Sequence, residues 1–209
     1  MDFTFIDPSA ISAREAYVLL LNCVAPRPIA FVSTLSSDGA PNLAPFSFFM
    51  AGGANPPSVV FSPTANRRSE PKDTLRNVEA TGEYVINVVS YAMREGMNAT
   101  SPEYPYGVSE WDKSGFTPAP SVKVRPSRVA ESLLAMECRM FQLVPHGDGP
   151  TAATYVIGEV VGFHIALSVL VDGAPDPRRV DYIARMSGDW YARANADCMF
   201  EMPRPPRAD

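Results

Sequence analysis

Residues 26–74 constrain the fold of this chain more than any other stretch, because three strand patterns and a helix start follow one another closely. Ile29–Leu35 is a mostly apolar run with β-branched and aromatic members, which predicts a buried strand. Asp38-Gly39 comes next, and glycine tolerates the positive φ that tight hairpin turns require. Pro41–Met50 and Ser58–Ser62 are the following strand patterns. The sequence therefore predicts a mainly β fold in which later strands close a barrel around this hairpin.

The predicted strand at Pro41–Met50 contains a proline in its interior, Pro45. Proline has no N–H to donate to a neighbouring strand, so this strand is expected at a sheet edge or bulged at Pro45. A bulge would leave backbone groups free to meet a ligand, and bulges are common beside active sites. An ordinary edge strand explains the pattern equally well, so both interpretations stay open.

Basic residues cluster just before a predicted helix. The helix is expected over Asp73–Thr81, with Gly82 as its C-terminal cap. Arg67 and Arg68 precede it, and Lys72 and Thr74 lie at its start. A helix N-terminus offers free N–H groups and the positive end of the helix dipole, so this arrangement predicts a phosphate site. The alternative is a solvated basic loop ahead of an ordinary helix.

Further elements are expected on both sides of this stretch. Ser12 and Glu15 have capping-box spacing, which predicts a helix to about Cys23 that would cover one mouth of the barrel. Two more helices are expected at Tyr91–Ala99 and Asp176–Arg185. Strands are expected at Glu83–Ser90, Ser121–Val124, Glu131–Val144 and Thr154–Ile165. Gly158 and Gly162 predict bends in the last of these strands.

Eight motifs follow one another in order along the chain: PRPIAFVST, DGAPNLAPFSFF, NPPSVVFS, KDTLRNVEATGEYVINVV, MNATSPEYPYGVSEWDKSGF, ESLLAMECRM, YVIGEVVGFHI and ARMSGDWYAR. In this order they resemble the flavin reductase-like family, the FMN-binding split barrels. The resemblance covers about residues 13–193, and the tail at 195–209 matches no family pattern. It implies one domain over residues 1–209, a split β-barrel of the Greek-key, FMN-binding type with flanking α-helices.

The same resemblance implies FMN as the cofactor and assigns residues to it. Arg67, Lys72 and Thr74 would hold the phosphate. The polar edge of the isoalloxazine ring would meet Ser33, Thr34, Asn42, Ser47 and the backbone of Ala44, Pro45 and Phe46. Ser62 and Thr64 would lie along the ribityl chain, and Arg27 completes the expected cofactor-binding set. No catalytic side chain is expected, because the cofactor carries the reaction.

Two functions are compatible with this resemblance. One is an NAD(P)H-dependent flavin reductase-like oxidoreductase, in which a transient nicotinamide passes hydride to FMN. The other is a non-enzymatic FMN electron carrier reduced by a protein partner. A barrel adapted to haem or pyridoxal phosphate is disfavoured by the KDT helix start and the APFSFF strand together. The resemblance also implies a homodimer and a partner monooxygenase.

Aromatic residues in the loop Thr100–Pro120 have two interpretations. Tyr104, Tyr106, Trp111 and Phe116 would either lie near the flavin or the partner subunit, or pin the loop to its own chain. Trp190 and Tyr191 are expected near the flavin, at the subunit interface or in the core. His164 is expected to be structural, since a lone histidine usually is.

Several classes of function are excluded by what the sequence lacks. A net charge of −5 argues against nucleic acid as a partner. The short apolar run Tyr17–Val24 predicts no membrane span, and without a signal sequence a cytoplasmic location is expected. The three widely spaced cysteines fit reduced thiols. Neither GxGxxG, a P-loop nor GxSxG occurs, and the two histidines lack ligand-spaced partners, so no metal site is expected.

Overall fold

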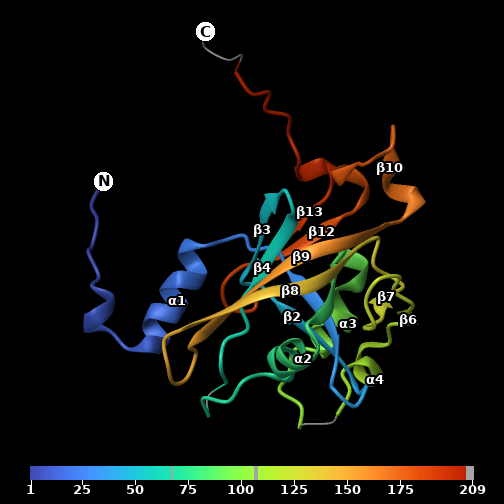
Figure 1. The fold of residues 1–209 in the computed structure, drawn as a ribbon. Coiled ribbons are helices and arrows are strands. Elements are labelled where there is room, and N and C mark those ends of the chain that lie inside the picture. The colour runs from blue at the N-terminus through green and yellow to red at the C-terminus, as the bar shows by residue number, and fades with distance from the viewer. Residues whose placement is uncertain (67, 106–107, 206–209) are drawn as a thin grey trace.

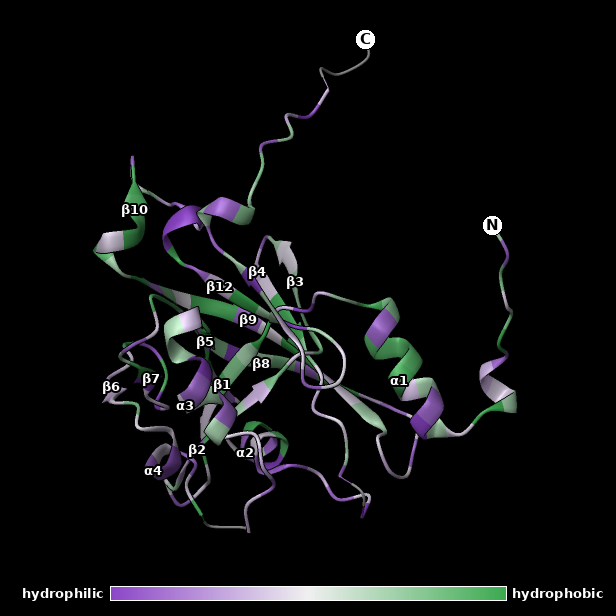
Figure 2. Ribbon diagram, turned by 180° about the vertical axis from the view of Figure 1, so that it is seen from behind, coloured by the Kyte–Doolittle hydropathy of each residue, from purple (hydrophilic) through white to green (hydrophobic). Residues whose placement is uncertain are grey.

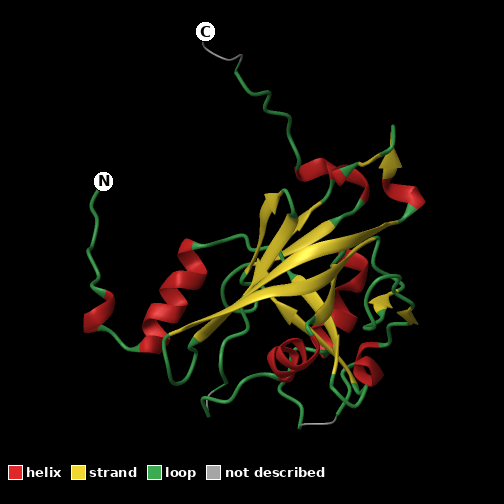
Figure 3. Cartoon of the chain, viewed as in Figure 1, coloured by secondary structure: helices red, strands yellow, loops and turns green. Residues whose placement is uncertain are grey.

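The computed structural model describes residues 1–66, 68–105 and 108–205. Seven strands form one antiparallel sheet in the order β2-β1-β5-β8-β9-β4-β3 (Figures 1 and 3). Its strands are β1 (Ala30–Leu35), β2 (Pro41–Phe46), β3 (Phe49–Ala54), β4 (Pro57–Phe61), β5 (Glu83–Val88), β8 (Leu134–His146) and β9 (Ala153–Ile165). The predicted mainly β fold is confirmed.

Short strand pairs and helices surround this sheet. The pairs are β6 (Pro118–Ala119) with β7 (Arg128–Val129), β10 (Leu170–Val171) with β11 (Ala174–Pro175), and β12 (Tyr182–Arg185) with β13 (Tyr191–Ala194). The α-helices are α1 (Ala13–Cys23), α2 (Asp73–Thr81), α3 (Arg94–Ala99) and α4 (Trp111–Ser114). Single 3-10 turns lie at Pro8–Ala10, Tyr91–Met93, Leu167–Val169, Pro177–Arg179 and Ala196–Cys198. None of the helices in this described part of the chain has the length and hydropathy needed to cross a membrane.

The two edge strands of the sheet are consecutive in the chain. β2 ends at Phe46 and β3 begins at Phe49, so only Ser47 and Phe48 connect opposite edges. A connection this short spans at most about 10 Å, so the sheet must curl until its edges meet at this corner. Within the described residues no ladder joins β2 to β3, so the sheet is open and the predicted barrel is not closed. β5 returns to pair with β1 after β2, β3 and β4, which is a Greek-key type of connection.

Alternation along β1 divides the buried side chains into two clusters. Ala30 and Val32 belong to a cluster with Phe61, Tyr84 and Cys138. Phe31 points to the opposite face, into a second cluster shared with α3, α4 and β12. That cluster contains Ile29, Phe31, Leu43, Val89, Met93, Met97, Trp111, Val129 and Ile183. The sheet is therefore covered on both faces near β1, which explains why every residue from Ala30 to Thr34 is buried.

The strand predicted at Pro41–Met50 divides into two strands. It ends at Phe46, where the chain passes from one sheet edge to the other. β2 is an edge strand, as Pro45 predicted, and Pro45 pairs in regular register with Phe31, without a bulge. Gly39 has the positive φ expected of the turn, in a loop closed by a hydrogen bond from the Ser36 N–H to the Ala40 carbonyl.

Two predicted elements are wrong. Ser121–Val124 is not a strand, because the backbone N–H groups of Val122, Lys123 and Val124 donate to the Glu137 carboxylate instead. The helix predicted over 176–185 stops after one 3-10 turn. Asp181 then has a φ of 55°, and the following residues pair as β12 with β13.

The N-terminal helix forms as predicted but does not cover the barrel. Ser12 and Glu15 make the expected capping box. However, no residue of α1 is buried, and the helix stands beside the sheet (Figure 2). Its nearest aromatic contact is between Tyr17 and Phe48, whose ring centroids are 6.1 Å apart. Most of the apolar surface of α1 is therefore left exposed.

Candidate functional site

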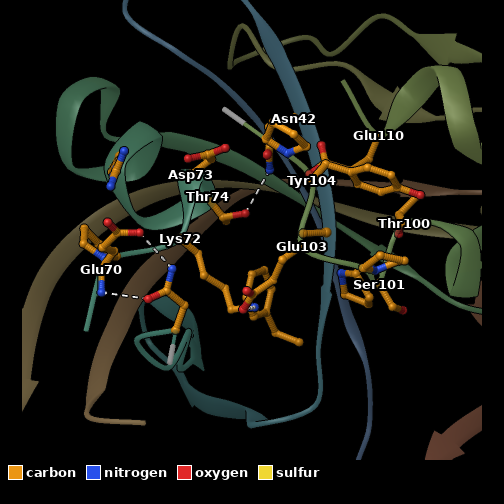
Figure 4. A pocket seen from close by; sticks show the side chains of 18 of the residues that line it. Asn42, Glu70, Lys72, Asp73, Thr74, Thr100, Ser101, Glu103, Tyr104 and Glu110 are labelled. Carbon is orange, nitrogen blue, oxygen red and sulfur yellow. Dashed lines mark hydrogen bonds and ion pairs between the residues drawn. The ribbon is translucent and has the colours of Figure 1, made fainter. Parts of the chain in front are cut away.

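A cleft of about 640 Å³ lies between the start of α2, the edge strand β2 and the segment 100–105. This volume is in the range of small-molecule sites. Polar and charged side chains from all three parts point into it (Figure 4). Its lining can be divided into a cationic rim around the first turn of α2 and a polar floor between α2 and β2.

The cationic rim surrounds an open helix N-terminus. Lys72 is the N-cap of α2, and its side chain makes no capping hydrogen bond. The amides of Asp73 and Thr74 lie in the first turn, where a helix has no carbonyl to bind them. Arg68, Lys72 and Arg76 line the cleft here. Free amides and cations together favour an anion at this position.

Carboxylates also line this end of the cleft and compete for the cations. Lys72 Nζ is 3.9 Å from Glu103 Oε1, and both side chains are partly exposed. Such an exposed pair is weakly held, so an incoming phosphate can displace Glu103 from Lys72. The described lining therefore does not carry a uniform positive charge, and the anion preference is local to the start of α2.

Asn66 organises the loop that carries the arginines. Its Oδ1 accepts hydrogen bonds from the N–H groups of Arg68 at 2.8 Å and Glu70 at 2.9 Å. Its Nδ2 donates to Glu70 Oε2 at 3.1 Å. Asn66 was not among the predicted site residues, although an asparagine that bonds the backbone two residues on is a known turn signal. The loop is thereby folded back so that Arg68 lies at the cleft.

The polar floor consists of Asn42 on β2, Thr74 on α2 and Glu110 before α4. All three line the cleft and are at most 9 % exposed. Asn42 Nδ2 and Thr74 Oγ1 are 2.9 Å apart, and the Leu43 N–H donates to Glu110 Oε2 at 3.2 Å. Burial raises the pKa of Glu110, and hydrogen bonds from its own amide and that of Leu43 oppose this rise. Glu110 was not among the predicted site residues, because a lone glutamate in a loop has no recognisable sequence pattern.

Six of the predicted cofactor-binding residues come together in this cleft. They are Asn42, Ala44, Pro45, Phe46, Lys72 and Thr74. They derive from two separate motifs that the fold brings side by side. Arg67, predicted to hold the phosphate, lies outside the described residues.

The other predicted residues do not line this cleft, and most have partners elsewhere. Thr34 Oγ1 accepts from Asn77 Nδ2 at 3.0 Å beneath α2, and Ser33 Oγ donates to the Ser127 carbonyl. Arg27 is 2 % exposed and donates to the carbonyls of Leu21, Val24 and Met186 and to Ser47 Oγ. The side chains of Arg27, Ser33, Thr34 and Ser47 thus bind other parts of the protein. Their contact with a cofactor stays a prediction.

Ser62 and Thr64, predicted along the ribityl chain, are placed beyond the cleft. Ser62 is 6 % exposed, and its Oγ has no hydrogen-bond partner within the described part of the chain. Thr64 forms an isolated bridge with Ala153. It lines a smaller hollow of about 220 Å³ that shares Pro71 and Lys72 with the main cleft. Thr64 is thus next to the cationic rim rather than within the cleft.

The aromatic residues of the 100–120 loop have separate roles. Tyr104 lines the cleft and donates from Oη to the Ala99 carbonyl at 2.8 Å. Trp111 is buried in the second core cluster, and Phe116 packs edge-on against Phe31. Trp111 and Phe116 thus pin the loop to its own chain, which is one of the two interpretations of the sequence. Tyr106 lies outside the described residues.

Two further predictions can be placed. Trp190 is 77 % exposed, so it is not a core residue, and it does not line the cleft. His164 is structural, as predicted, because its Nε2 hydrogen-bonds to the buried carboxylate of Glu137. Among residues 1–66, 68–105 and 108–205, no three potential metal ligands gather into a group.

An open, curled antiparallel sheet of this kind is found in split-barrel proteins. A similar solved structure, from Shewanella frigidimarina, has a split barrel domain, with a TM-score of 0.77 and 25 % identity over 96 % of both chains. A family model for the flavin reductase like domain matches residues 22–174. The chain therefore belongs to the flavin reductase-like family, whose members are oxidoreductases with a flavin as cofactor or substrate.

Individual relatives agree with this assignment. The chain is 36 % identical to an uncharacterized protein of Halalkalibacterium halodurans over 96 % of both chains. The crystal structure of nitrilotriacetate monooxygenase component B from Bacillus cereus is similar with a TM-score of 0.90. It is 31 % identical, with 97 % of this chain and all of that chain covered. The 2-nitrobenzoate 2-nitroreductase of Pseudomonas fluorescens is similar with a TM-score of 0.85 and 26 % identity, over 99 % and 100 % of the two chains.

The residues of the cleft fit a phosphorylated flavin. The uncapped start of α2 with Lys72 and Arg68 suits a phosphate, and the polar floor suits a ligand with several hydrogen-bonding atoms. Tyr104 adds an aromatic side chain to the lining. β2 is an edge strand, so half of its backbone N–H and C=O groups have no ladder partner.

Proposed function

We propose that this protein is an FMN-binding, flavin reductase-like oxidoreductase that transfers hydride from NAD(P)H to FMN. Membership of the flavin reductase-like family supports a flavin as the cofactor or substrate. The observation that carries the choice of FMN is the open N-terminus of α2, flanked by Lys72 and Arg68 at one end of the cleft. A phosphate that ends the ligand at this point matches FMN in size and charge.

Each part of the cleft has a proposed task. Lys72, Thr74 and Arg68, which line the cleft, bind the phosphate, and Arg67 is assigned to it from the sequence alone. The backbone of β2 from Ala44 to Phe46 and the Asn42 side chain orient the polar edge of the ring. When bound, FMN would supply the ring that accepts hydride. The chain would bind and orient it, and Tyr104 would limit access from the side of the 100–105 segment.

An absorbance spectrum under anaerobic conditions tests this proposal. We expect purified protein reconstituted with FMN to show flavin absorbance that bleaches on addition of NADH or NADPH. Flavin absorbance that persists with both nicotinamides would contradict the reductase and favour the FMN electron carrier. Protein that fails to bind added FMN would overturn the cofactor as well.

The phosphate assignment has its own test. We expect the double variant Arg67→Ala, Lys72→Ala to weaken FMN binding by about tenfold or more, because charge-assisted hydrogen bonds are lost. Riboflavin, which lacks the phosphate, should bind both proteins equally. Lys123→Ala is the matched control, since Lys123 is exposed and does not line the cleft. Unchanged FMN affinity in the double variant would contradict the assignment.

We also propose a homodimer and a monooxygenase partner in the cytoplasm. The exposed apolar residues of α1 support self-association. Similarity to component B of nitrilotriacetate monooxygenase supports a monooxygenase partner. Cys23, Cys138 and Cys198 are all free thiols, which supports a reducing compartment.

A further inference from the structure

Glu110 is a buried carboxylate at the floor of the cleft that has no task in the proposed function. It belongs to the segment before α4, whereas Asn42 lies on β2 and Thr74 lies in the first turn of α2. Figure 4 shows the three side chains facing one another. Three elements far apart in the sequence thus meet in one polar cluster, and one member of it also lies at the proposed phosphate position.

The Asn42 amide can take two orientations within this cluster. In one, Nδ2 donates to Thr74 Oγ1 at 2.9 Å but also faces the Leu43 N–H, and Oδ1 faces Glu110, so this orientation is unfavourable while Glu110 is ionised. In the other, Nδ2 donates to Glu110 Oε2 at 3.2 Å, and Oδ1 accepts from Thr74 Oγ1 at 2.9 Å and from the Leu43 N–H at 3.1 Å. The two orientations place opposite hydrogen-bonding groups next to Glu110.

The ionisation of Glu110 selects between these orientations. An ionised carboxylate only accepts, so it requires Nδ2 of Asn42 on its side. The Thr74 hydroxyl then donates its one hydrogen to Asn42 Oδ1. A protonated Glu110 instead donates to Oδ1, and the amide turns Nδ2 toward Thr74 Oγ1. The hydroxyl hydrogen of Thr74 is then free to donate to a ligand at the start of α2.

We propose that Glu110 is a positioning residue that controls, through Asn42, whether Thr74 can donate a hydrogen bond to the ligand's phosphate. This inference rests on the proposed function, because it takes the FMN phosphate as that ligand. FMN binding and protonation of Glu110 favour each other by linkage. Binding should therefore take up protons, and FMN affinity should fall as pH rises through the pKa of Glu110.

The surroundings of Glu110 favour its protonated form. Burial raises the pKa of Glu110, and the charge of Asp73 on α2 adds to the rise. Asp112 and Lys113 follow Glu110 on its own segment, and residues 41–46 of β2 carry no charge. Other charged side chains in the cleft are Arg68, Glu70, Lys72, Arg76 and Glu103.

A phosphate could also favour protonated Glu110 by charge repulsion alone, without the hydroxyl. Thr74 separates the two routes, because Thr74→Val removes the hydroxyl and keeps the side-chain shape. Thr74→Ser keeps the hydroxyl and is the matched control. If the hydroxyl is the link, Thr74→Val loses the proton coupling and Thr74→Ser retains it.

The test is calorimetry of FMN binding in buffers that differ in ionisation enthalpy, with wild type and Glu110→Gln compared above pH 4.5. The titration of the FMN phosphate is common to both proteins, so their difference reports Glu110. We expect wild type to take up more protons than Glu110→Gln, by at most about one per FMN. Thr74→Val should lose this excess, and riboflavin should show none in any variant.

Three outcomes would overturn the inference. The first is equal proton uptake by wild type and Glu110→Gln, with FMN bound by both. The second is a full excess in Thr74→Val, which would leave charge repulsion as the cause. Thr74→Val can also be compared directly with Thr74→Ser, and equal proton uptake by these two variants would overturn the inference even if Glu110→Gln fails to fold. The third is failure of wild type to bind FMN, which would contradict the proposed function itself.

Discussion

The phenol of Tyr84 on β5 occupies the space that a side chain at Gly158 on β9 would need. Tyr84 is fully buried, and a Cβ at Gly158 would overlap Tyr84 Oη and lie 2.7 Å from Cζ. The Arg139 carbonyl on β8 would be 3.2 Å from the same Cβ. The glycine is thus required by close packing between strands rather than by a positive φ.

We therefore expect Gly158→Ala to destabilise the protein by about 2–3 kcal/mol, because overpacking a buried site forces side chains and backbone to move. Gly162→Ala is the matched control on the same strand, since its Cβ would be 3.7 Å from the nearest atom of Glu137. Denaturant unfolding of the two variants checks this. Equal stability losses would show that Gly158 has no special packing role.

The same contact predicts a rescue. Tyr84 Oη makes no hydrogen bond of good geometry among the described residues, although the Cys138 thiol lies close to it, so Tyr84→Phe removes the overlapping atom at little cost. We expect Tyr84→Phe to recover part of the loss caused by Gly158→Ala. A double-mutant cycle measures the coupling free energy, and strictly additive effects would contradict the contact.

The hydrogen bonds of the buried Glu137 carboxylate lead us to expect that the stability of the protein depends on pH. It is 1 % exposed and binds His164 and three backbone N–H groups of residues 122–124. Burial alone would raise the pKa of Glu137, but the hydrogen bonds from His164, Val122 and Lys123 outweigh burial and lower it. Stability from Glu137 is thus complete above the ordinary value of 4.5 and is lost as pH falls through the lowered pKa.

We expect Glu137→Gln to cost about 2–3 kcal/mol at neutral pH, because an amide cannot accept all of these hydrogen bonds. The variant should also lose stability less steeply than wild type as pH falls below about 4.5. Denaturant unfolding at several pH values measures both effects. The exposed Glu159→Gln on β9 is the control and should match wild type at every pH.

Local sequence signals predicted the elements whose residues interact mainly with their neighbours in the chain. The capping box at Ser12, the helix from Asp73 and the Pro45 edge strand all formed as expected. The wrong predictions involve distant partners. Residues 122–124 have a strand-like composition, but Glu137 takes their amides, and a sequence window around them does not contain Glu137.

In the candidate site, too, residues with a local sequence pattern were predicted and residues that depend on distant partners were not. Lys72 and Thr74 were recognised because basic residues at a helix start form a local pattern. Glu110 was not, because its significance depends on burial beside Asn42 and Thr74. Ser33 and Thr34 were assigned to the ring edge by resemblance, but their hydroxyls bind Ser127 and Asn77. Which face a buried hydroxyl meets depends on the packing of distant elements.

A substitution at Arg27 can distinguish between a packing role and a cofactor-binding role for this residue. Its guanidinium joins the carbonyls at the end of α1 to the carbonyl of Met186. Arg27→Lys keeps the charge but loses the planar fork of donors. We expect it to lower stability by about 2–4 kcal/mol while FMN affinity stays unchanged. Thermal unfolding and fluorescence titration check this. An unchanged melting temperature with weakened FMN binding would instead place Arg27 at the cofactor.

The exposed helix α1 predicts how the chain associates. Val18, Leu20 and Val24 are 47 %, 50 % and 51 % exposed, and no residue of the helix is buried. An isolated helix of 11 residues is marginal in water, so a second surface should stabilise it. We expect light scattering at micromolar concentration to give twice the 22.7 kDa mass of the chain. Leu20→Glu should shift this mass to the monomer, because a buried unpaired charge opposes association.

Arg14→Glu, a charge change at an exposed polar position of the same helix, should leave the dimer intact. A monomeric wild type would exclude self-association through α1, and equal dissociation by both variants would attribute it to charge rather than to the apolar face.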